Sequence, residues 1–183
     1  MVTRALWSNP PVVFFYGLVA FPSRHAAGFI AGAVTGTQVL DVGTGTGIIA
    51  KAVAQKGVSL TGVDPSAQML KYAVKIPGAK FLQGSATKLP VQDKSQDTLM
   101  YNYVLRYVSR KDLDTVIAEM DRVARDRATV IISDLMLPRL LVLDKQVLGA
   151  LDWGKVKKEL GVRGFKLTQT YHPFLSRVLV FKR

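Results

Sequence analysis

The stretch that decides the fold is VLDVGTGTG, residues 39–47. A short apolar run with one acid, Asp41, leads directly into glycines at positions 43, 45 and 47, and residues 48–54 (IIAKAVA) then favour a helix. Strand, glycine turn and helix in this order form the first half of a nucleotide-binding βαβ unit. Glycine is needed at such a turn because the backbone bends sharply and a ligand approaches the main chain where a Cβ would collide. The free N–H groups that begin the helix then face the polar end of that ligand.

A second landmark follows at residues 58–63 (VSLTGV), which favour a strand that ends in Asp64. An acidic side chain just past the second strand accepts hydrogen bonds from the hydroxyls of a ribose, in a nicotinamide protein as in others. The glycine spacing discriminates between them. A dinucleotide fingerprint, G-x-G-x-x-G/A, would place its third small residue at Ile48, whereas here the third glycine is Gly47.

These landmarks resemble the class I S-adenosylmethionine-dependent methyltransferases, whose signature is an acidic residue followed by G-x-G-x-G. Residues 63–70 (VDPSAQML), 81–90 (FLQGSATKLP) and 95–100 (SQDTLM) are similar to the family's later segments, in the same order. The resemblance runs from about residue 24 to residue 134 and is closest to the ubiquinone/menaquinone-biosynthesis branch (methyltransferase type 11). It implies a Rossmann-like α/β fold, with a doubly wound sheet that is mostly parallel, one antiparallel C-terminal strand and helices on both faces.

The resemblance also implies a cofactor, S-adenosyl-L-methionine, with S-adenosyl-L-homocysteine as product. Asp41 is expected to orient the glycine loop or the cofactor's ammonium, and Asp64 to bind the ribose. Ser85 stands where the family has an aspartate that accepts from the adenine amino group, so this contact lacks a charge. The expected cofactor-binding set is Asp41, Gly43, Thr44, Gly45, Gly47, Asp64, Pro65, Met69, Ser85, Ala86, Asn102 and Arg24.

No catalytic constellation stands out in the sequence. The methyl group of the cofactor is already electrophilic, so the protein mainly aligns the acceptor, and a base is needed only where the acceptor must lose a proton. The residues that compete for this role are Tyr103, Asp134, His172 and Tyr16. Asn102-Tyr103 lacks the two prolines of the [DN]-P-P-[YFW] motif, which argues against an adenine or glutamine N-methylase.

Composition bounds the remaining choices. The 183 residues suffice for one packed domain, and the absence of cysteine excludes disulfides, cysteine nucleophiles and thiolate metal sites. With only two histidines, no metal site is expected, and a cytoplasmic location fits. The net charge of +12 attracts phosphate-rich or membrane partners, although scarce glutamate alone gives a soluble, self-repelling surface.

Three functional hypotheses follow. The favoured one is methyl transfer to a small, apolar or aromatic acceptor. The alternative is an RNA (rRNA or tRNA) methyltransferase that uses the basic surface. The third is a non-catalytic or nicotinamide-binding relative. The oligomeric state is left open.

The chain is expected to divide into an N-terminal lid or cap, residues 1–23, and a single methyltransferase domain, residues 24–183. Residues 12–21 (VVFFYGLVAF) are too few for a transmembrane helix, which needs roughly 20 apolar residues. They resemble the apolar core of a signal peptide, but cleavage there would damage the helix that feeds the first strand. The readings left open are a lid over an apolar acceptor, a cap on the core, and membrane-surface contact through residues 11–21.

Periodicity and turn residues predict the remaining elements. Helices are expected at residues 23–34, 48–56, 66–75, 110–124, 140–151 and 153–160, with Ser23 as the cap of the first. Strands are expected at residues 38–42, 58–64, 80–83, 97–101, 128–132, 164–170 and 175–181. A tight return at residues 126–127 is expected to separate the fourth helix from the fifth strand.

Overall fold

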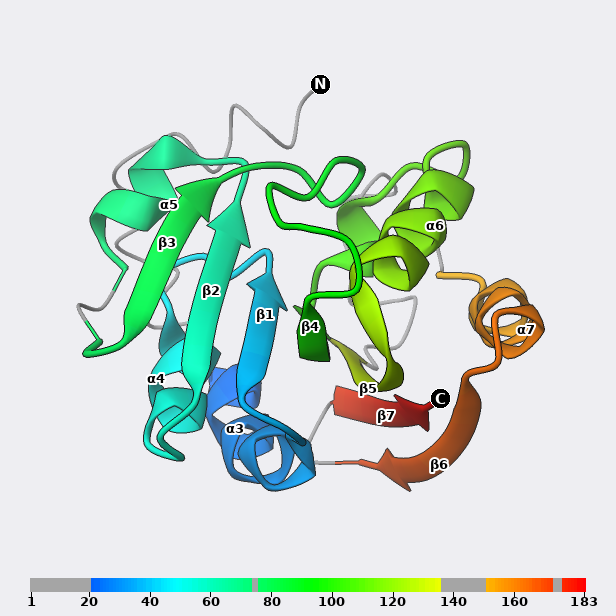
Figure 1. The fold of residues 1–183 in the computed structure, drawn as a ribbon, viewed down its shortest axis with the longest axis horizontal. Coiled ribbons are helices and arrows are strands. Elements are labelled where there is room, and N and C mark those ends of the chain that lie inside the picture. The colour runs from blue at the N-terminus through cyan, green and yellow to red at the C-terminus, as the bar shows by residue number, and fades with distance from the viewer. Residues whose placement is uncertain (1–20, 74–75, 136–150, 173–175) are drawn as a thin grey trace.

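The computed structural model describes residues 21–73, 76–135, 151–172 and 176–183. Within them, seven strands form one sheet in the order β3-β2-β1-β4-β5-β7-β6 (Figure 1). β1 to β5 are parallel, and β7 pairs antiparallel with both β5 and β6. The predicted Rossmann-like α/β class is confirmed. The strands are β1 (Gln38–Val42), β2 (Ser59–Asp64), β3 (Ala79–Gln83), β4 (Gln96–Asn102), β5 (Ala124–Leu135), β6 (Lys166–Tyr171) and β7 (Ser176–Lys182).

Helices cover both faces of this sheet because its central strands are apolar on both sides. Leu40 and Leu99 point to one face, while their neighbours Val39 and Met100 point to the other. The first face packs against α6 and α7, and the second against α3 and α4. The helical elements are α3 (Phe21–Ala33), α4 (Ile48–Ala54), α5 (Ala67–Lys71), η1 (Leu105–Tyr107), α6 (Leu113–Val123) and α7 (Trp153–Val162).

The order of the strands reverses between β1 and β4, which places a switch point in the middle of the sheet. β1 leads outward to β2 and β3, whereas the chain returns through β4 on the other side of β1. In open α/β sheets, ligands bind outside the carboxyl ends of the strands at such a point. The glycine turn after β1 lies there.

Three local expectations are wrong. No tight return exists at Asp126-Arg127, because α6 ends at Val123 and β5 begins at Ala124. The extra residues are absorbed by a bulge, since Gln96 pairs with Ala124 but Thr98 pairs with Thr129. The helix expected to reach residue 75 ends at Lys71, where Tyr72 N–H bonds to Met69 O and tightens the last turn. Ser23 lies inside α3 and is not its cap.

Two other expectations fall partly outside the described residues. Of the helix expected at residues 140–151, only the last residue belongs to the described part of the chain. Of the expected lid, residues 21–23 belong to α3 and the rest lie outside. Within the described ranges, no helix combines the length and the apolarity that crossing a bilayer requires.

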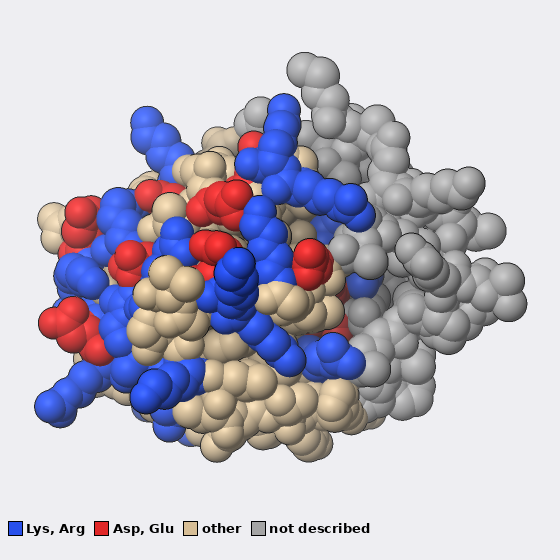
Figure 2. All heavy atoms as spheres, turned by 90° about the vertical axis from the view of Figure 1, so that its right-hand side faces the viewer, with Lys and Arg blue, Asp and Glu red and all other residues tan. Residues whose placement is uncertain are grey.

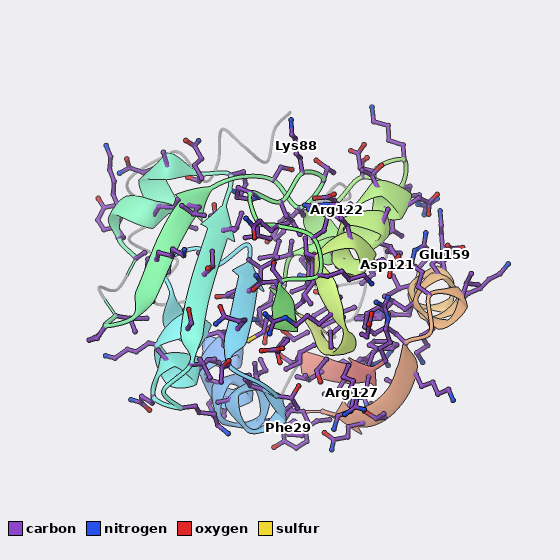
Figure 3. All side chains as sticks on the ribbon, in the orientation of Figure 1. Phe29, Lys88, Asp121, Arg122, Arg127 and Glu159 are labelled. Atoms are coloured by element: carbon purple, nitrogen blue, oxygen red, sulfur yellow. The ribbon has the colours of Figure 1, made fainter. Side chains whose placement is uncertain are left out.

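Arg122 fastens the loop that follows β3 to helix α6. Its guanidinium donates to the carboxylate of Glu119 at 2.7 and 2.8 Å, to Asp93 at 2.6 Å, and to the backbone oxygens of Leu89 and Val91 at 3.0 Å. Glu119 in turn accepts from Leu89 N–H at 2.7 Å. Figure 3 shows Arg122 between α6 and the loop that carries Lys88. Arg122 therefore ties the loop between β3 and β4 to the C-terminal turn of α6.

We expect Arg122→Met to lower the free energy of unfolding by about 2 kcal/mol. The carboxylate of Glu119 would lose its charged partner, and the carbonyl oxygens of Leu89 and Val91 would lose their donor. Urea denaturation followed by circular dichroism measures this change. Arg127→Met is the matched control: Arg127 is exposed on β5, at the other end of the view in Figure 3, and its replacement should change the stability by less than about 0.5 kcal/mol. Equal effects of the two variants would contradict the role given to Arg122.

Candidate functional site

The turn after β1 is built from three glycines with positive φ: +69° at Gly43, +56° at Gly45 and +79° at Gly47. Gly43 N–H and Thr44 N–H both donate to Val63 O, at 2.7 and 3.1 Å, which bonds the turn to β2. At Gly43 a Cβ would lie 2.2 Å from Cγ2 of Val104. Position 43 therefore requires glycine for two reasons. Its φ is positive, and the chain that follows β4 leaves no room for a Cβ.

Asp64 is the last residue of β2, and its carboxylate accepts a hydrogen bond from the same turn. One carboxylate oxygen accepts from Gly45 N–H at 2.9 Å and the other from Ser66 N–H at 2.8 Å. Burial raises the pKa of Asp64 above its usual value, although the two backbone bonds act in the opposite direction. Each oxygen has a second lone pair, so the carboxylate can still accept from two hydroxyl groups of a ligand.

Asp41 lies in β1 with an exposed fraction of 1%. Its carboxylate accepts from Thr44 Oγ1 at 2.7 Å and from Asn102 Nδ2 at 3.3 Å. Burial raises the pKa of Asp41 to about 7; the bonds from Thr44 and Asn102 offset part of the rise, and the nearby charge of Asp64 adds to it. A buried acid with spare lone pairs suits a cationic group, which would restore its ionised form.

Asp41 opens onto a pocket at the carboxyl ends of β1 and β4. The residues that line it are Asp41, Gly43, Thr44, Thr46, Ile48, Ile49, Asn102 and Tyr103. The pocket thus brings together four members of the predicted cofactor set and one candidate base. Sequence reasoning missed Thr46, Ile48 and Ile49, although all three stand in or next to the glycine motif, and their position alone could have suggested them.

The other predicted cofactor residues lie outside this lining. Gly45 and Gly47 shape the turn, with Gly47 N–H bonded to Thr44 O at 2.9 Å. Pro65 is exposed, and Met69 is buried in α5. Ser85 is exposed and its hydroxyl bonds to that of Thr87 at 2.8 Å, while Ala86 packs against the core. Arg24 belongs to α3, and its side chain lies outside the described residues.

The four candidate bases are not gathered at one point. Tyr103 lines the pocket with φ +59°, and its hydroxyl bonds to Ser176 Oγ at 2.9 Å. Asp134 forms a nearly buried ion pair with Arg106 at 2.6 Å. His172 is exposed just after β6, which is separated from β4 by β5 and β7. Tyr16 lies outside the described residues. Among those residues, no group of acids and histidines could hold a metal ion.

Comparison with known proteins agrees with the fold and the glycine motif. The profile of the family described as a methyltransferase domain matches residues 40–132, and the chain belongs to this family, as the sequence predicted. The demethylmenaquinone methyltransferase of Chlorobaculum tepidum is 36% identical over 110 residues, which cover 59% of this chain and 45% of that protein. The malonyl-[acyl-carrier protein] O-methyltransferase of Hamiltonella defensa is 31% identical over 137 residues, covering 74% and 50%. This chain spans about half the length of these curated relatives.

Solved structures share the whole architecture. The magnesium protoporphyrin IX methyltransferase of Synechocystis, solved with bound S-adenosylhomocysteine, superposes with a TM-score of 0.78 at 19% identity and covers 100% of this chain and 98% of that one. A S-adenosylmethionine-dependent methyltransferase from Archaeoglobus fulgidus gives 0.78 at 13% identity, covering 96% and 100%. At such identities the likeness concerns the fold.

The raised pKa of Asp41 predicts a characteristic pH dependence of stability. Because the folded state holds the proton more tightly than an unfolded chain (pKa 3.8), Asp41 costs no stability below about pH 4 and an increasing amount up to about pH 7. We expect Asp41→Asn to stabilise the protein at pH 8 by about 2 kcal/mol, and the gain to vanish near pH 4. Thermal unfolding across this pH range measures it.

Asp97→Asn is the control with the opposite sign. Burial raises the pKa of Asp97, but the bonds from Gln38 N–H, Arg125 and Thr37 N–H outweigh it, so that the pKa lies below its usual value. Its contribution to stability is therefore present above pH 4 and is lost as the pH falls further. A stability gain from Asp41→Asn that is the same at pH 4 and pH 8 would refute the assignment of the buried charge.

Proposed function

We propose that this chain is a S-adenosylmethionine-dependent methyltransferase that acts on a small, apolar or aromatic acceptor. The observation that carries the proposal is the pair of buried acids on either side of the glycine turn. Asp41 lies one residue before the end of β1 and lines the pocket, and Asp64 is the last residue of the neighbouring strand β2. Together with membership of the methyltransferase family, this spacing suits a ligand that has an ammonium at one end and a ribose in its middle.

The residues present fit such a ligand. Asp41 is a buried acceptor that two donors leave unsaturated, which suits the ammonium of the methionine part. Gly43, Thr46 and Ile48 line the same pocket. Asp64 is held by two backbone N–H groups in an orientation that leaves lone pairs for ribose hydroxyls. For Ser85 and Met69, contact with the adenine remains part of the proposal.

When bound, the cofactor supplies an electrophilic methyl group on a sulfonium ion. The residues of this chain would bind the cofactor, exclude water, and align the acceptor with the bond that breaks. Asp134 is engaged by Arg106, and the hydroxyl of Tyr103 by Ser176. Neither arrangement is that of a base poised for proton transfer. We therefore assign the described residues to positioning, with the acceptor arriving already nucleophilic.

The relatives favour a small acceptor. Their names specify demethylmenaquinone and malonyl-[acyl-carrier protein] as what they act on. The RNA alternative rests on the net charge of +12, and no comparison supports it. Figure 2 shows that Lys and Arg are interspersed with Asp and Glu on the face formed by α6 and α7. Several of these charges are paired there, such as Lys155 with Asp114 and Arg163 with Glu159.

Calorimetric titration with S-adenosylhomocysteine tests the cofactor site. We expect micromolar binding by the wild type and a loss of at least about 100-fold in Asp64→Ala, because both the ribose contact and the brace on Gly45 disappear. Asp64→Asn keeps an acceptor oxygen and should bind with intermediate affinity. Asp126→Ala removes an exposed acid whose side chain is 94% accessible and should bind like the wild type. A wild type that does not bind would contradict the proposed function.

The acceptor class is tested by the release of S-adenosylhomocysteine in the presence of candidate acceptors. We expect turnover with a short-chain demethylmenaquinone, a malonyl thioester or a porphyrin carboxylic acid, and none with total tRNA or rRNA. Each reaction is compared with Asp64→Ala, which should abolish the signal. Turnover with RNA alone would replace the small-acceptor proposal by the alternative.

A further inference from the structure

Four buried side chains form a continuous series of hydrogen bonds across the carboxyl ends of β1, β4 and β5. Ser133 Oγ donates to Asn102 Oδ1 at 2.9 Å, Asn102 Nδ2 donates to Asp41 Oδ1 at 3.3 Å, and Thr44 Oγ1 donates to Asp41 Oδ2 at 2.7 Å. Their exposed fractions lie between 1% and 9%. Asp41, Thr44 and Asn102 line the pocket, whereas Ser133 does not. The hydroxyl of Ser133 can therefore influence a ligand in the pocket through Asn102.

The direction of these bonds follows from the chemistry of the groups. An ionised carboxylate only accepts, so Asp41 needs a hydrogen from Thr44 and another from Asn102. An asparagine amide carries NH₂ on one side and oxygen on the other, and a half-turn would place its oxygen against the carboxylate. In the observed orientation Ser133 Oγ supplies the hydrogen that Asn102 Oδ1 needs, while the NH₂ donates to Asp41. Asp41 accepts only, so it favours the same orientation of the amide, and the Ser133 hydroxyl adds to that preference by donating to the amide oxygen.

The register of the sheet places Ser133 for this role. Asn102 and Ser133 are direct partners in the parallel pairing of β4 with β5. β4 ends at Asn102, and the N–H of the next residue, Tyr103, donates to Ser133 O at 2.8 Å. The backbone of Ser133 thus fixes the turn after β4, while its hydroxyl fixes the amide. A substitution that removes only the hydroxyl leaves the backbone bond in place and separates the two effects.

We propose that Ser133 is a positioning residue for the amino end of the cofactor: it holds the Asn102 amide so that its NH₂ faces Asp41, which keeps Asp41 an acceptor for the ligand's ammonium. The inference rests on the proposed function, since the cofactor supplies the ammonium. Through Ser133, β5 would contribute to cofactor binding although Ser133 does not line the pocket.

The charges around Asp41 show what removal of the hydroxyl would change. Burial raises the pKa of Asp41, the bonds from Thr44 and Asn102 lower it, and the charge of Asp64, from β2, raises it. Turning the amide would replace one of the two lowering bonds by a contact between two acceptors. A larger fraction of Asp41 would then be protonated near neutral pH, and ammonium binding would require a higher pH.

The test compares Ser133→Ala with Thr129→Val. Thr129 lies on the same strand, is 1% exposed, and bonds through its hydroxyl to Thr35 Oγ1 at 2.7 Å, at the other end of the sheet from the pocket. Both variants thus remove one buried hydroxyl from β5. Two quantities are measured: the affinity for S-adenosylhomocysteine between about pH 5.5 and pH 8.5 by calorimetry, and the pKa of Asp41 in the ligand-free protein by carbon-13 NMR, with Asp41→Asn for assignment.

We expect Ser133→Ala to weaken binding about tenfold at pH 7 and less at pH 8.5, and to raise the pKa of ligand-free Asp41. Thr129→Val should lower the melting temperature similarly but leave both quantities as in the wild type, and Ser133→Thr should restore both. If Ser133→Ala lowers only the melting temperature, Ser133 is merely structural and this inference is overturned while the proposed function stands. A wild type that does not bind S-adenosylhomocysteine overturns both.

Discussion

The attachment of the glycine turn to the end of β2 is the constraint on which the rest of the site depends. Val63 O receives two N–H groups of the turn, and Asp64 receives a third, so the turn has one position relative to β2. The positive φ values of its glycines make this path accessible. Because β1 lies between β2 and β4, the same turn also meets the chain that leaves β4, where Val104 occupies the space that a Cβ of Gly43 would need.

This geometry forces two acids into a poorly hydrated region. Asp41 and Asp64 both have raised pKa values, with burial as the main cause, and the charge of Asp64 adds to the rise at Asp41. In the free protein this arrangement costs stability, which is common where a site is prepared for a charged ligand. The donors around the acids limit the cost: backbone N–H groups at Asp64, and side chains at Asp41. The choice of side-chain donors at Asp41 makes its protonation sensitive to β4 and β5.

Sequence reasoning about catalysis could not foresee how the polar residues beyond β4 are paired. Asp134 and Tyr103 each stand at the carboxyl edge of the sheet, as expected from their place after apolar strands. Their partners, Arg106 and Ser176, are distant in sequence, separated by 28 and 73 residues respectively. Whether a side chain is an available base or part of a structural pair depends on such partners. A pattern along the chain does not contain this information.

The sequence by itself determined the succession of strands and helices, the glycine turn, and the two acids near the ends of β1 and β2, because apolar periodicity and glycine's backbone freedom are local properties. It misjudged the junction of α6 with β5, where strand pairing starts at Ala124 and absorbs the expected turn in a bulge. Only the tertiary structure decided that Asn102 donates to Asp41 and Ser133 to Asn102, and that Arg122 fastens the loop after β3 to α6. The physical reason is that a buried polar group must find its partners across neighbouring strands, and the register of those strands is set by packing of the whole sheet.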